Sequence, residues 1–268
     1  MCKGGDNGSQ FNVVNCINFD AMKPNKFILL VFFVLPRLGV FAQSKPPSHD
    51  VFDKLLKKHV LEDGRVNYKG FIQDSVLLNQ YLSTLSNHPP NKTWSANEDK
   101  AFWINAYNAF TIKLIIDHYP VKSIKDLAGS IYKINTPWDI QFIKIGEETY
   151  DLNNIEHAKL RRVYNDPRIH FAVVCASKSC PKLLNEAYVA VKLEAQLDQA
   201  GRDFLKNAFR NNISSDKASI SNIFKWYKGD FTEEGTLIDF LNKYAPVKIK
   251  SNAEISYLDY DWSLNDWP

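Results

Sequence analysis

The chain contains none of the short signatures that mark the commonest enzyme classes. Its 268 residues hold no G-x-S-x-G, no H-E-x-x-H, no Walker loop and no G-x-G-x-x-G. These motifs build, in that order, a nucleophile elbow, a zinc site, a phosphate cradle and a dinucleotide-binding turn. Their absence argues against serine hydrolases of the common fold, zincins and nucleotide-dependent enzymes.

The chain also lacks an excess of charge of one sign. Lys and Arg together number 33, Asp and Glu together number 30, and the formal net charge is +3. Proteins that bind nucleic acid or anionic membranes usually carry a strongly basic patch. We therefore expect neither nucleic acid nor an anionic membrane surface as a partner.

Long apolar runs are scarce. The run at residues 27–35 is well short of the about 20 residues that span a bilayer. Lys23 and Lys26 precede it and a small-x-small cleavage site ends at Ala42, which together predict a signal peptide over residues 22–42. A buried strand or a membrane anchor is the alternative. We expect residues 1–21 to be unstructured or to precede the true start, and the protein to be exported, periplasmic or extracellular, with no membrane span after cleavage.

Cysteine is rare, and two of the four cysteines, Cys2 and Cys16, lie before the predicted cleavage site. Outside the cytosol, the remaining pair, Cys175 and Cys180, favours a disulfide. A bridge that closes so short a loop adds only about 2 kcal/mol to stability in the chain-entropy model. It would be a local clamp.

The rest of the chain predicts a folded domain. Aromatic residues make up 13% of the sequence, which argues for a packed globular fold and against disorder. After a linker at residues 43–50, helices and strands alternate irregularly, so we expect one α+β domain over residues 51–268 with a small, mainly antiparallel sheet. The predicted helices cover residues 49–60, 74–85, 95–118, 151–164, 189–206 and 232–244. The predicted strands cover residues 141–145, 148–150, 169–175, 218–224 and 254–262.

The helix at residues 95–118 is apolar in nearly every direction, so we expect it to be buried at the centre of the fold. Asn105 and Asn108, one turn apart, must then lie inside and bond to a partner. They either tie the helix to a neighbouring loop or take part in a site, by orienting a base or donating to an oxyanion. Trp103, on the same helix, is a candidate binding residue.

The stretch DPRIHFAVVCASKSCP, residues 166–181, is the most informative part of the chain. It predicts a strand over residues 169–175 that delivers Cys175 into a loop of small residues. Three interpretations of Cys175 stay open: a disulfide with Cys180, a buried inert thiol, and a nucleophile activated by His, with the Lys178 charge lowering its pKa. A metal site shared with the histidines fits no familiar zinc spacing, so we expect no metal.

Two histidines are candidate partners for Cys175. His157 follows Glu156 on the predicted helix at residues 151–164, and Glu156 either forms an ion pair with Lys159 or an arginine, or lies near a catalytic His157. His170 lies in the predicted strand, where alternation places it and Cys175 on opposite faces. This geometry favours His157 as the base.

Three blocks resemble one family. AFWINAYNAFTIKLI (residues 101–115), IEHAKLR (155–161) and DPRIHFAVVCASKSCP (166–181) resemble the signature blocks of the domain-of-unknown-function family 547, and YLDYDW (257–262) is similar to the end of its bacterial members. The resemblance covers about residues 96–262. The family has no agreed activity, and its plant members, which join the domain to a coiled coil, are regarded as partner-binding proteins. This chain lacks the coiled coil, so that role does not carry over directly.

The resemblance also bears on the cysteines. Plant members keep a cysteine matching Cys175 but often carry serine in place of Cys180. This implies that a bridge is not required by the fold and that Cys175 acts as a free thiol, with His157 and Asn105 at matching polar positions.

Two functional hypotheses follow. The first is an exported cysteine-dependent hydrolase or acyl/amide-transfer enzyme without a cofactor, in which Cys175 attacks, His157 is the base, and Glu156 or Asn105 orients it. Backbone N–H groups of residues 176–179 would hold the oxyanion, and the substrate would be a small molecule, peptide or glycan. The second is a non-catalytic peptide- or glycan-binding interaction domain with structural cysteines. The remaining candidate binding residues are His170, Ser177, Lys178, Arg161, Asn108 and Trp103.

Overall fold

The computed structural model describes residues 45–127 and 136–267. The predicted signal peptide therefore lies outside the described residues. None of the helices in the described segments has both the length and the apolar character needed to cross a membrane.

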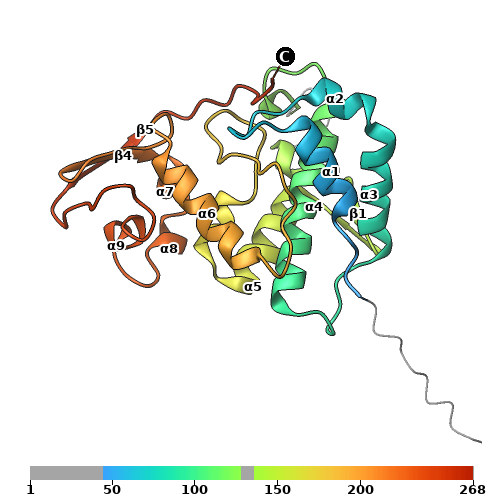
Figure 1. Cartoon of the computed structure of the whole chain (residues 1–268), viewed down its shortest axis with the longest axis horizontal. Helices are drawn as coiled ribbons and strands as arrows, with labels where there is room; N and C mark the ends of the chain where they lie inside the picture. The colour runs from blue at the N-terminus through green and yellow to red at the C-terminus, as the bar shows by residue number, and fades with distance from the viewer. Residues whose placement is uncertain (1–44, 128–135, 268) are drawn as a thin grey trace, which may run out of the picture. The chain divides into compact units, whose positions relative to one another are not determined.

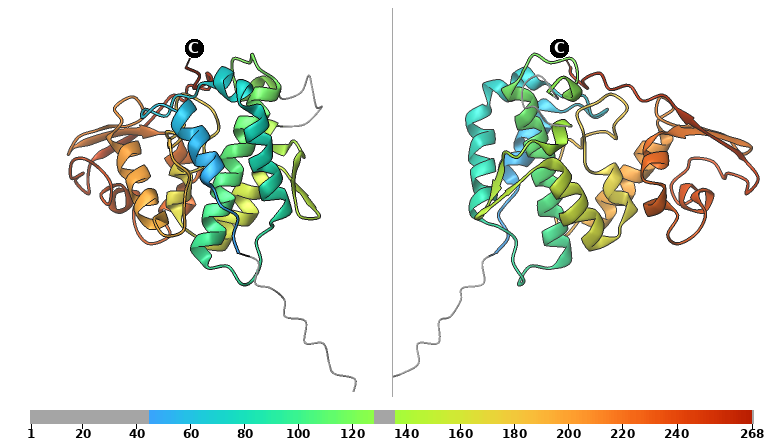
Figure 2. Two further views of the ribbon diagram at one scale, coloured as in Figure 1. Left: turned by 45° about the vertical axis from the view of Figure 1, so that its right-hand side comes forward. Right: turned by 180° about the vertical axis from the view of Figure 1, so that it is seen from behind.

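Helix α4, Ala96–Asp117, is the centre of the first half of the fold. It begins at a capping box in which Ser95 accepts from the Glu98 amide and Glu98 accepts from the Ser95 amide, so the predicted start is confirmed. Buried residues occupy every direction around it, as the apolar pattern predicts. Helices α1 (Asp50–His59), α2 (Tyr68–Gln73) and α3 (Ser75–Asn87) gather around α4 (Figures 1 and 2).

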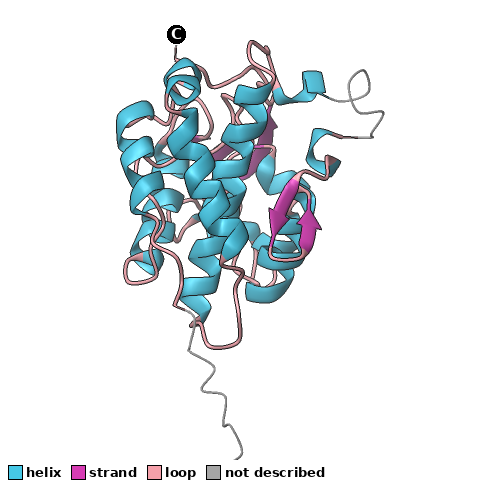
Figure 3. Ribbon diagram, turned by 90° about the vertical axis from the view of Figure 1, so that its right-hand side faces the viewer, coloured by secondary structure: helices cyan, strands magenta, loops and turns pink. Residues whose placement is uncertain are grey.

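A short hairpin flanks these helices. Strands β1 (Ile143–Ile145) and β2 (Glu148–Tyr150) pair antiparallel, which confirms the predicted hairpin. Gly146 has a φ of 63°, a left-handed conformation that glycine adopts at little cost in the tight turn. Its amide donates to the Ser86 carbonyl at 2.7 Å, so the hairpin docks on the end of α3 (Figure 3).

The second half of the fold packs around Phe171. Helix α6 (Leu193–Lys206) precedes a three-stranded sheet in which β3 (Asn212–Ile213) pairs antiparallel and β5 (Glu254–Leu258) parallel with the central strand β4 (Lys217–Ser221). Between β4 and β5 lie the short helices α7 (Ile223–Trp226), α8 (Lys228–Phe231) and α9 (Leu237–Leu241). The described residues thus form a single α+β domain, and the predicted fold class is confirmed.

The predicted strand at residues 169–175 is wrong. The segment begins as a 3₁₀-helix, η4 (Pro167–Phe171), and continues as an irregular chain. Pro167 suits the first helical position, and the Asp166 carboxylate caps the Arg168 amide. Asn108 then satisfies the following backbone, because its amide donates to the Ala172 carbonyl and accepts from the Val174 amide, both at 2.9 Å. Since a helix side chain provides these bonds, no neighbouring strand is needed.

The helix predicted at residues 151–164 has an unusual form. Residues Asn154–Arg161 form a π-helix, η3, which continues as the short helix α5 (Arg162–Tyr164). Asp151 accepts from the Asn154 amide at 2.6 Å and so caps its start. π-Helical segments are rare and occur often at functional sites. Two further 3₁₀-turns, η1 (Ile124–Leu127) and η2 (Pro137–Asp139), complete the described elements.

Candidate active site

The structure brings Cys175 to a cavity of about 220 Å³. Its walls come from segments that are far apart in the sequence: α4, η2, η3, η4, the chain from Val173 to Pro181, α7 and the stretch after β5. The polar and sulfur-bearing residues that line it are Tyr107, Thr136, Asn153, Glu156, His170, Cys175, Cys180, Tyr227 and Tyr260, and its apolar walls include Trp138, Trp226 and Trp262. The cavity therefore combines two thiols with other ionisable groups.

Cys175 and Cys180 are free thiols rather than a disulfide. Their sulfur atoms lie 3.0 Å apart, and the Cys175 amide donates to the Cys180 Sγ, also at 3.0 Å. Cys175 is half-buried, whereas Cys180 is only 3% exposed. Both thiols line the cavity, and Cys175 is the more accessible of the two.

The surroundings of Cys175 favour its thiolate. A hydrogen bond from Cys180 is the largest influence, and the hydroxyls of Ser177 (3.3 Å) and Tyr260 (3.4 Å) add to it. Burial opposes ionisation, but the donors outweigh it and lower the pKa of Cys175 to about 7. The sequence pointed to Lys178 for this effect; its side chain is exposed instead.

The loop that follows Cys175 is held tightly. Ala176 has a φ of 61°, a conformation that costs a non-glycine residue about 1–2 kcal/mol. Its carbonyl accepts from the Asn265 amide at 3.0 Å, and the Lys178 amide donates to the Ser263 carbonyl at 2.9 Å. The guanidinium of Arg210 also donates to the carbonyls of Lys178 and Cys180. The segment after β5 and one arginine thus fix the reactive loop.

These bonds correct the predicted oxyanion hole. The amides of Lys178 and Ser179 donate to the carbonyls of Ser263 and Asp261. The Ser177 amide is directed at the Cys175 sulfur. Three of the four N–H groups are therefore already engaged, and the Tyr260 hydroxyl, in contact with the sulfur, is a further donor that the cavity offers.

Glu156 and His170 contribute a pair of ionisable side chains to the cavity. Both are buried, and the His170 Nδ1 lies 4.0 Å from the Glu156 Oε1. The His170 Nε2 lies 2.7 Å from the Asp230 Oδ2, and its ring stacks on Tyr227 with centroids 3.9 Å apart. The Tyr107 hydroxyl donates to Glu156 at 3.5 Å. The hydrogen bond from His170 lowers the pKa of Asp230 well below its usual range, although burial opposes this shift.

His157 lies outside the residues that line the cavity. Its Nδ1 is 2.8 Å from the Arg161 guanidinium, and burial is the main cause that lowers its pKa. Arg161 in turn donates to both carboxylate oxygens of Asp230. Consecutive residues of a helix point in different directions, so Glu156 and His157 do not face the same cavity. His170, and not His157, therefore lines the same cavity as Cys175. The sequence favours His157 only because a strand at residues 169–175 would place His170 and Cys175 on opposite faces, and that strand is absent.

The two asparagines of α4 act as structural ties. Asn105 donates to the Tyr188 carbonyl at 2.7 Å and accepts from the Tyr188 amide at 3.0 Å, away from the cavity. Asn108 holds the chain just before Cys175, as described above, and so positions that residue. Trp103 lies in the core, where its ring contacts Tyr150 edge to face.

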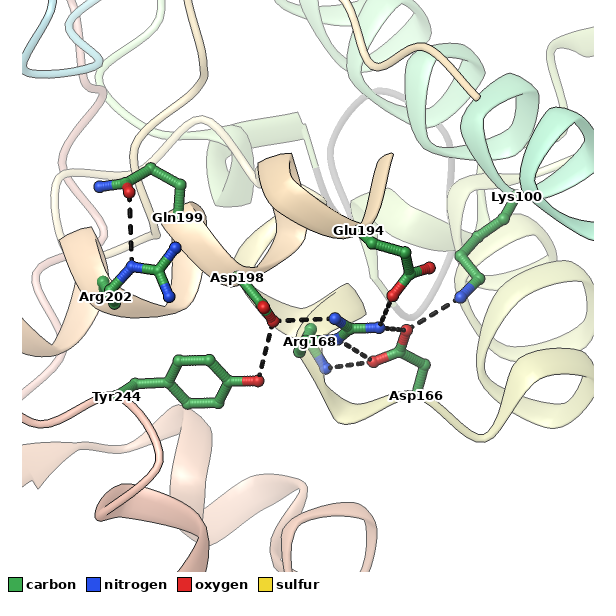
Figure 4. A network of polar contacts seen from close by, with 8 residues as sticks. All are labelled: Lys100, Asp166, Arg168, Glu194, Asp198, Gln199, Arg202 and Tyr244. Carbon is green, nitrogen blue, oxygen red and sulfur yellow. Dashed lines mark hydrogen bonds and ion pairs between the residues drawn. The ribbon is translucent and has the colours of Figure 1, made fainter. Parts of the chain in front are cut away.

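An ion-pair network anchors the start of η4 and hence His170. The Asp166 carboxylate accepts from Lys100 of α4 at 2.9 Å and from Arg168, which also bonds to Glu194 and Asp198 of α6 (Figure 4). Burial opposes ionisation of Asp166, but the bonds from Arg168 and Lys100 outweigh it and lower its pKa. A larger hollow of about 400 Å³ lies beside this network. The central charges there pair with one another, so the cavity at Cys175 is the better candidate site.

Several residues of the site were not identified from the sequence. Tyr107, Tyr227 and Asp230 carried no distinctive local pattern. Tyr260 and Trp262 stand in YLDYDW, whose aromatic content was the one available signal. Around Trp262, the rings of Tyr260, Trp226 and Trp138 have centroids 4.5, 5.7 and 5.7 Å away.

Comparisons with known proteins agree with the resemblance seen in the sequence. Residues 91–205 match the family model described as "Protein of unknown function, DUF547". Neither the curated proteins nor the solved structures gave a match. The matched segment includes Glu156, His170, Cys175 and Cys180. Residues 91–205 therefore form a segment of the DUF547 family.

Proposed function

We propose that the protein is a cysteine-dependent enzyme of acyl or amide transfer, a hydrolase or a transferase, with Cys175 as its nucleophile. The observation that carries this proposal is the Cys175 sulfur itself. It faces a cavity and lies within hydrogen-bond distance of the Cys180 thiol and of the Ser177 and Tyr260 hydroxyls, groups that can donate to the sulfur once it is ionised. Such donors stabilise a thiolate, and the thiolate is the reactive form of cysteine.

In this mechanism, the hydrogen-bond donors around Cys175 favour its thiolate, so no histidine base is needed to remove the thiol proton. Within the described chain, no hydrogen bond joins Cys175 to His170 or His157. With a pKa of about 7, close to half of the thiol is ionised at neutral pH without such a base. The Glu156–His170 pair, on another wall of the same cavity, then serves the leaving group.

The proposed reaction has two steps. The Cys175 sulfur forms a bond to the carbonyl carbon, the bond from that carbon to nitrogen or oxygen breaks, and the Glu156–His170 pair gives the leaving group its proton. Water or an acceptor amine or alcohol then attacks the thioester, gives up a proton to the same pair, and releases the thiolate. The Tyr260 hydroxyl, 3.4 Å from the sulfur, is the candidate donor to the carbonyl oxygen.

The size of the cavity limits the acyl part of the substrate. Ligand pockets that enclose a drug-sized molecule measure about 300–1,000 Å³, whereas this cavity measures about 220 Å³. Trp226 is 48% exposed and joins Trp262 in an aromatic wall. We therefore propose that a small acyl group enters the cavity and that the leaving group, such as a peptide or glycan, lies over the tryptophans.

The test is the trapping of an acyl-enzyme. Activated esters of short carboxylic acids are mixed with the protein, quenched in acid and analysed by intact mass and peptide mapping. We expect acylation of Cys175 that is retained in Cys180→Ser and lost in Cys175→Ser. Acylation that persists in Cys175→Ser, or its absence from a wild-type protein that alkylates normally, would contradict the proposal.

The Trp138, Trp226 and Trp262 cluster favours a second candidate, a binding module for peptides or glycans. Aromatic side chains offer large contact areas with a polar edge, and they are enriched at binding surfaces. Binding of peptide or glycan arrays that is unchanged in Cys175→Ser and lost in Trp262→Ala would favour this candidate over catalysis.

We also propose that the protein is exported, on the strength of the basic and apolar pattern at residues 22–42. N-terminal sequencing of the protein from its native cells tests this, with a start at Gln43 as the expected result and an intact N-terminus as the contrary one.

A further inference from the structure

We propose that Cys175 and Cys180 form a reversible dithiol–disulfide pair, and that the cavity therefore also carries out thiol–disulfide exchange with small disulfide compounds. This activity shares its nucleophile with the proposed acyl transfer. It does not depend on that chemistry, because it needs no carbonyl substrate and no oxyanion donor.

The geometry of the pair supports the inference. The two sulfur atoms are 3.0 Å apart, about 1 Å more than the length of a disulfide bond. A small movement of one side chain closes this gap. The Cys175 amide points at the Cys180 sulfur at 3.0 Å, so a backbone donor is already in place for charge on the second sulfur.

The two thiols differ in the way that exchange requires. Cys175 is half-buried and faces the cavity, whereas Cys180 is 3% exposed. A substrate disulfide therefore meets Cys175 first, and Cys180 is placed to attack only after a mixed disulfide has formed. The lowered pKa of Cys175 suits the attacking thiol, whereas burial raises the pKa of Cys180 and keeps that thiol protonated before the mixed disulfide forms.

The loop between the two cysteines is held in place, so the two thiols stay close to each other. Arg210 holds the carbonyls of Lys178 and Cys180, and the Ser179 hydroxyl accepts from the Asp261 amide at 2.9 Å. Because these bonds involve the backbone and Ser179 rather than either sulfur, they do not need to break when the disulfide forms.

The exchange proceeds in two steps. The Cys175 thiolate attacks one sulfur of the substrate disulfide; a new sulfur–sulfur bond forms, the substrate bond breaks, and the first substrate thiolate leaves. Cys180 then attacks the Cys175 sulfur, its proton passes to the departing second thiolate, and the Cys175–Cys180 disulfide forms. Two electrons pass from the pair to the substrate, which leaves as two thiols. A small-molecule thiol in excess reverses both steps and restores the pair.

The experiment uses the full chain with Cys2→Ser and Cys16→Ser, so that all thiol signals come from the pair. The reduced protein is incubated with oxidised glutathione, quenched in acid, alkylated and analysed by intact mass. We expect both thiols to disappear together, with the loss of two hydrogen masses and no retained glutathione. Excess reduced glutathione should return both thiols.

Matched variants separate the two roles. Cys180→Ser should accumulate a stable glutathione adduct on Cys175. Cys175→Ser should leave Cys180 at least about tenfold slower to react, because that thiol is buried and less acidic. A stable adduct in the protein with both cysteines, thiols that resist oxidised glutathione, or equal reactivity of Cys180 in Cys175→Ser would each overturn the proposal. Since Cys180→Ser retains the nucleophile, acylation of that variant reports on the proposed acyl transfer separately.

Discussion

Replacement of Cys180 by alanine is the most informative perturbation of the site. The Cys180 thiol is the largest of the influences that bring the pKa of Cys175 from 9.0 to about 7. A hydrogen bond to a charged group contributes about 1.5–3 kcal/mol, and one pKa unit corresponds to about 1.4 kcal/mol. We therefore expect Cys180→Ala to raise the pKa of Cys175 by about one to two units, to about 8–9.

The assay is the pH dependence of alkylation by iodoacetamide, measured in protein with Cys2→Ser and Cys16→Ser. The midpoint of the profile is the readout, because a less acidic thiolate is also more nucleophilic and a rate at one pH mixes the two effects. Cys180→Ser, which keeps a donor of similar size, is the matched control and should stay near the wild-type midpoint. A midpoint that is unchanged or lower in Cys180→Ala would refute the reasoning.

Three further predictions concern the supporting residues. Asn108→Ala leaves two buried backbone groups without partners and should cost about 2–4 kcal/mol in urea unfolding, with slower or altered Cys175 alkylation; Asn105→Ala should lose similar stability and leave alkylation unchanged. His170→Ala should abolish turnover of an acyl substrate, whereas His157→Ala should retain most of it. Loss of turnover in His157→Ala but not in His170→Ala would instead support His157 as the base. Because the folded pKa of Asp230 is depressed, its contribution to stability is present above about pH 4 and is lost as pH falls through the folded pKa; Asp230→Asn should flatten this acid limb in pH-dependent unfolding.

The sequence predicted those parts of the fold whose signals are local. The start of α4 follows from the Ser95–Glu98 capping box, and its burial follows from an apolar pattern without a polar face. The hairpin follows from Gly146 between the short strand-favouring segments at residues 141–145 and 148–150. In each case the residues that determine the structure are neighbours in the chain.

The segment before Cys175 shows why other parts were not predicted. Its β-branched and aromatic residues favour a strand, but its backbone partner is the Asn108 side chain, more than sixty residues earlier. The alternation of side chains in a strand would place His170 and Cys175 on opposite faces, but this segment is not a strand. Tyr260 and Asp230 reach the site only through the tertiary fold, so no local pattern could assign them.

The central claim is that Cys175 ionises near neutral pH inside an open cavity. The most direct test is a titration of the ultraviolet absorbance of the thiolate in the native protein with Cys2→Ser and Cys16→Ser, compared with the same protein carrying Cys175→Ser. We expect a transition near pH 7 that disappears in the Cys175→Ser variant. A first transition at or above the ordinary cysteine pKa of about 8.5, or one that survives the loss of Cys175, would contradict it.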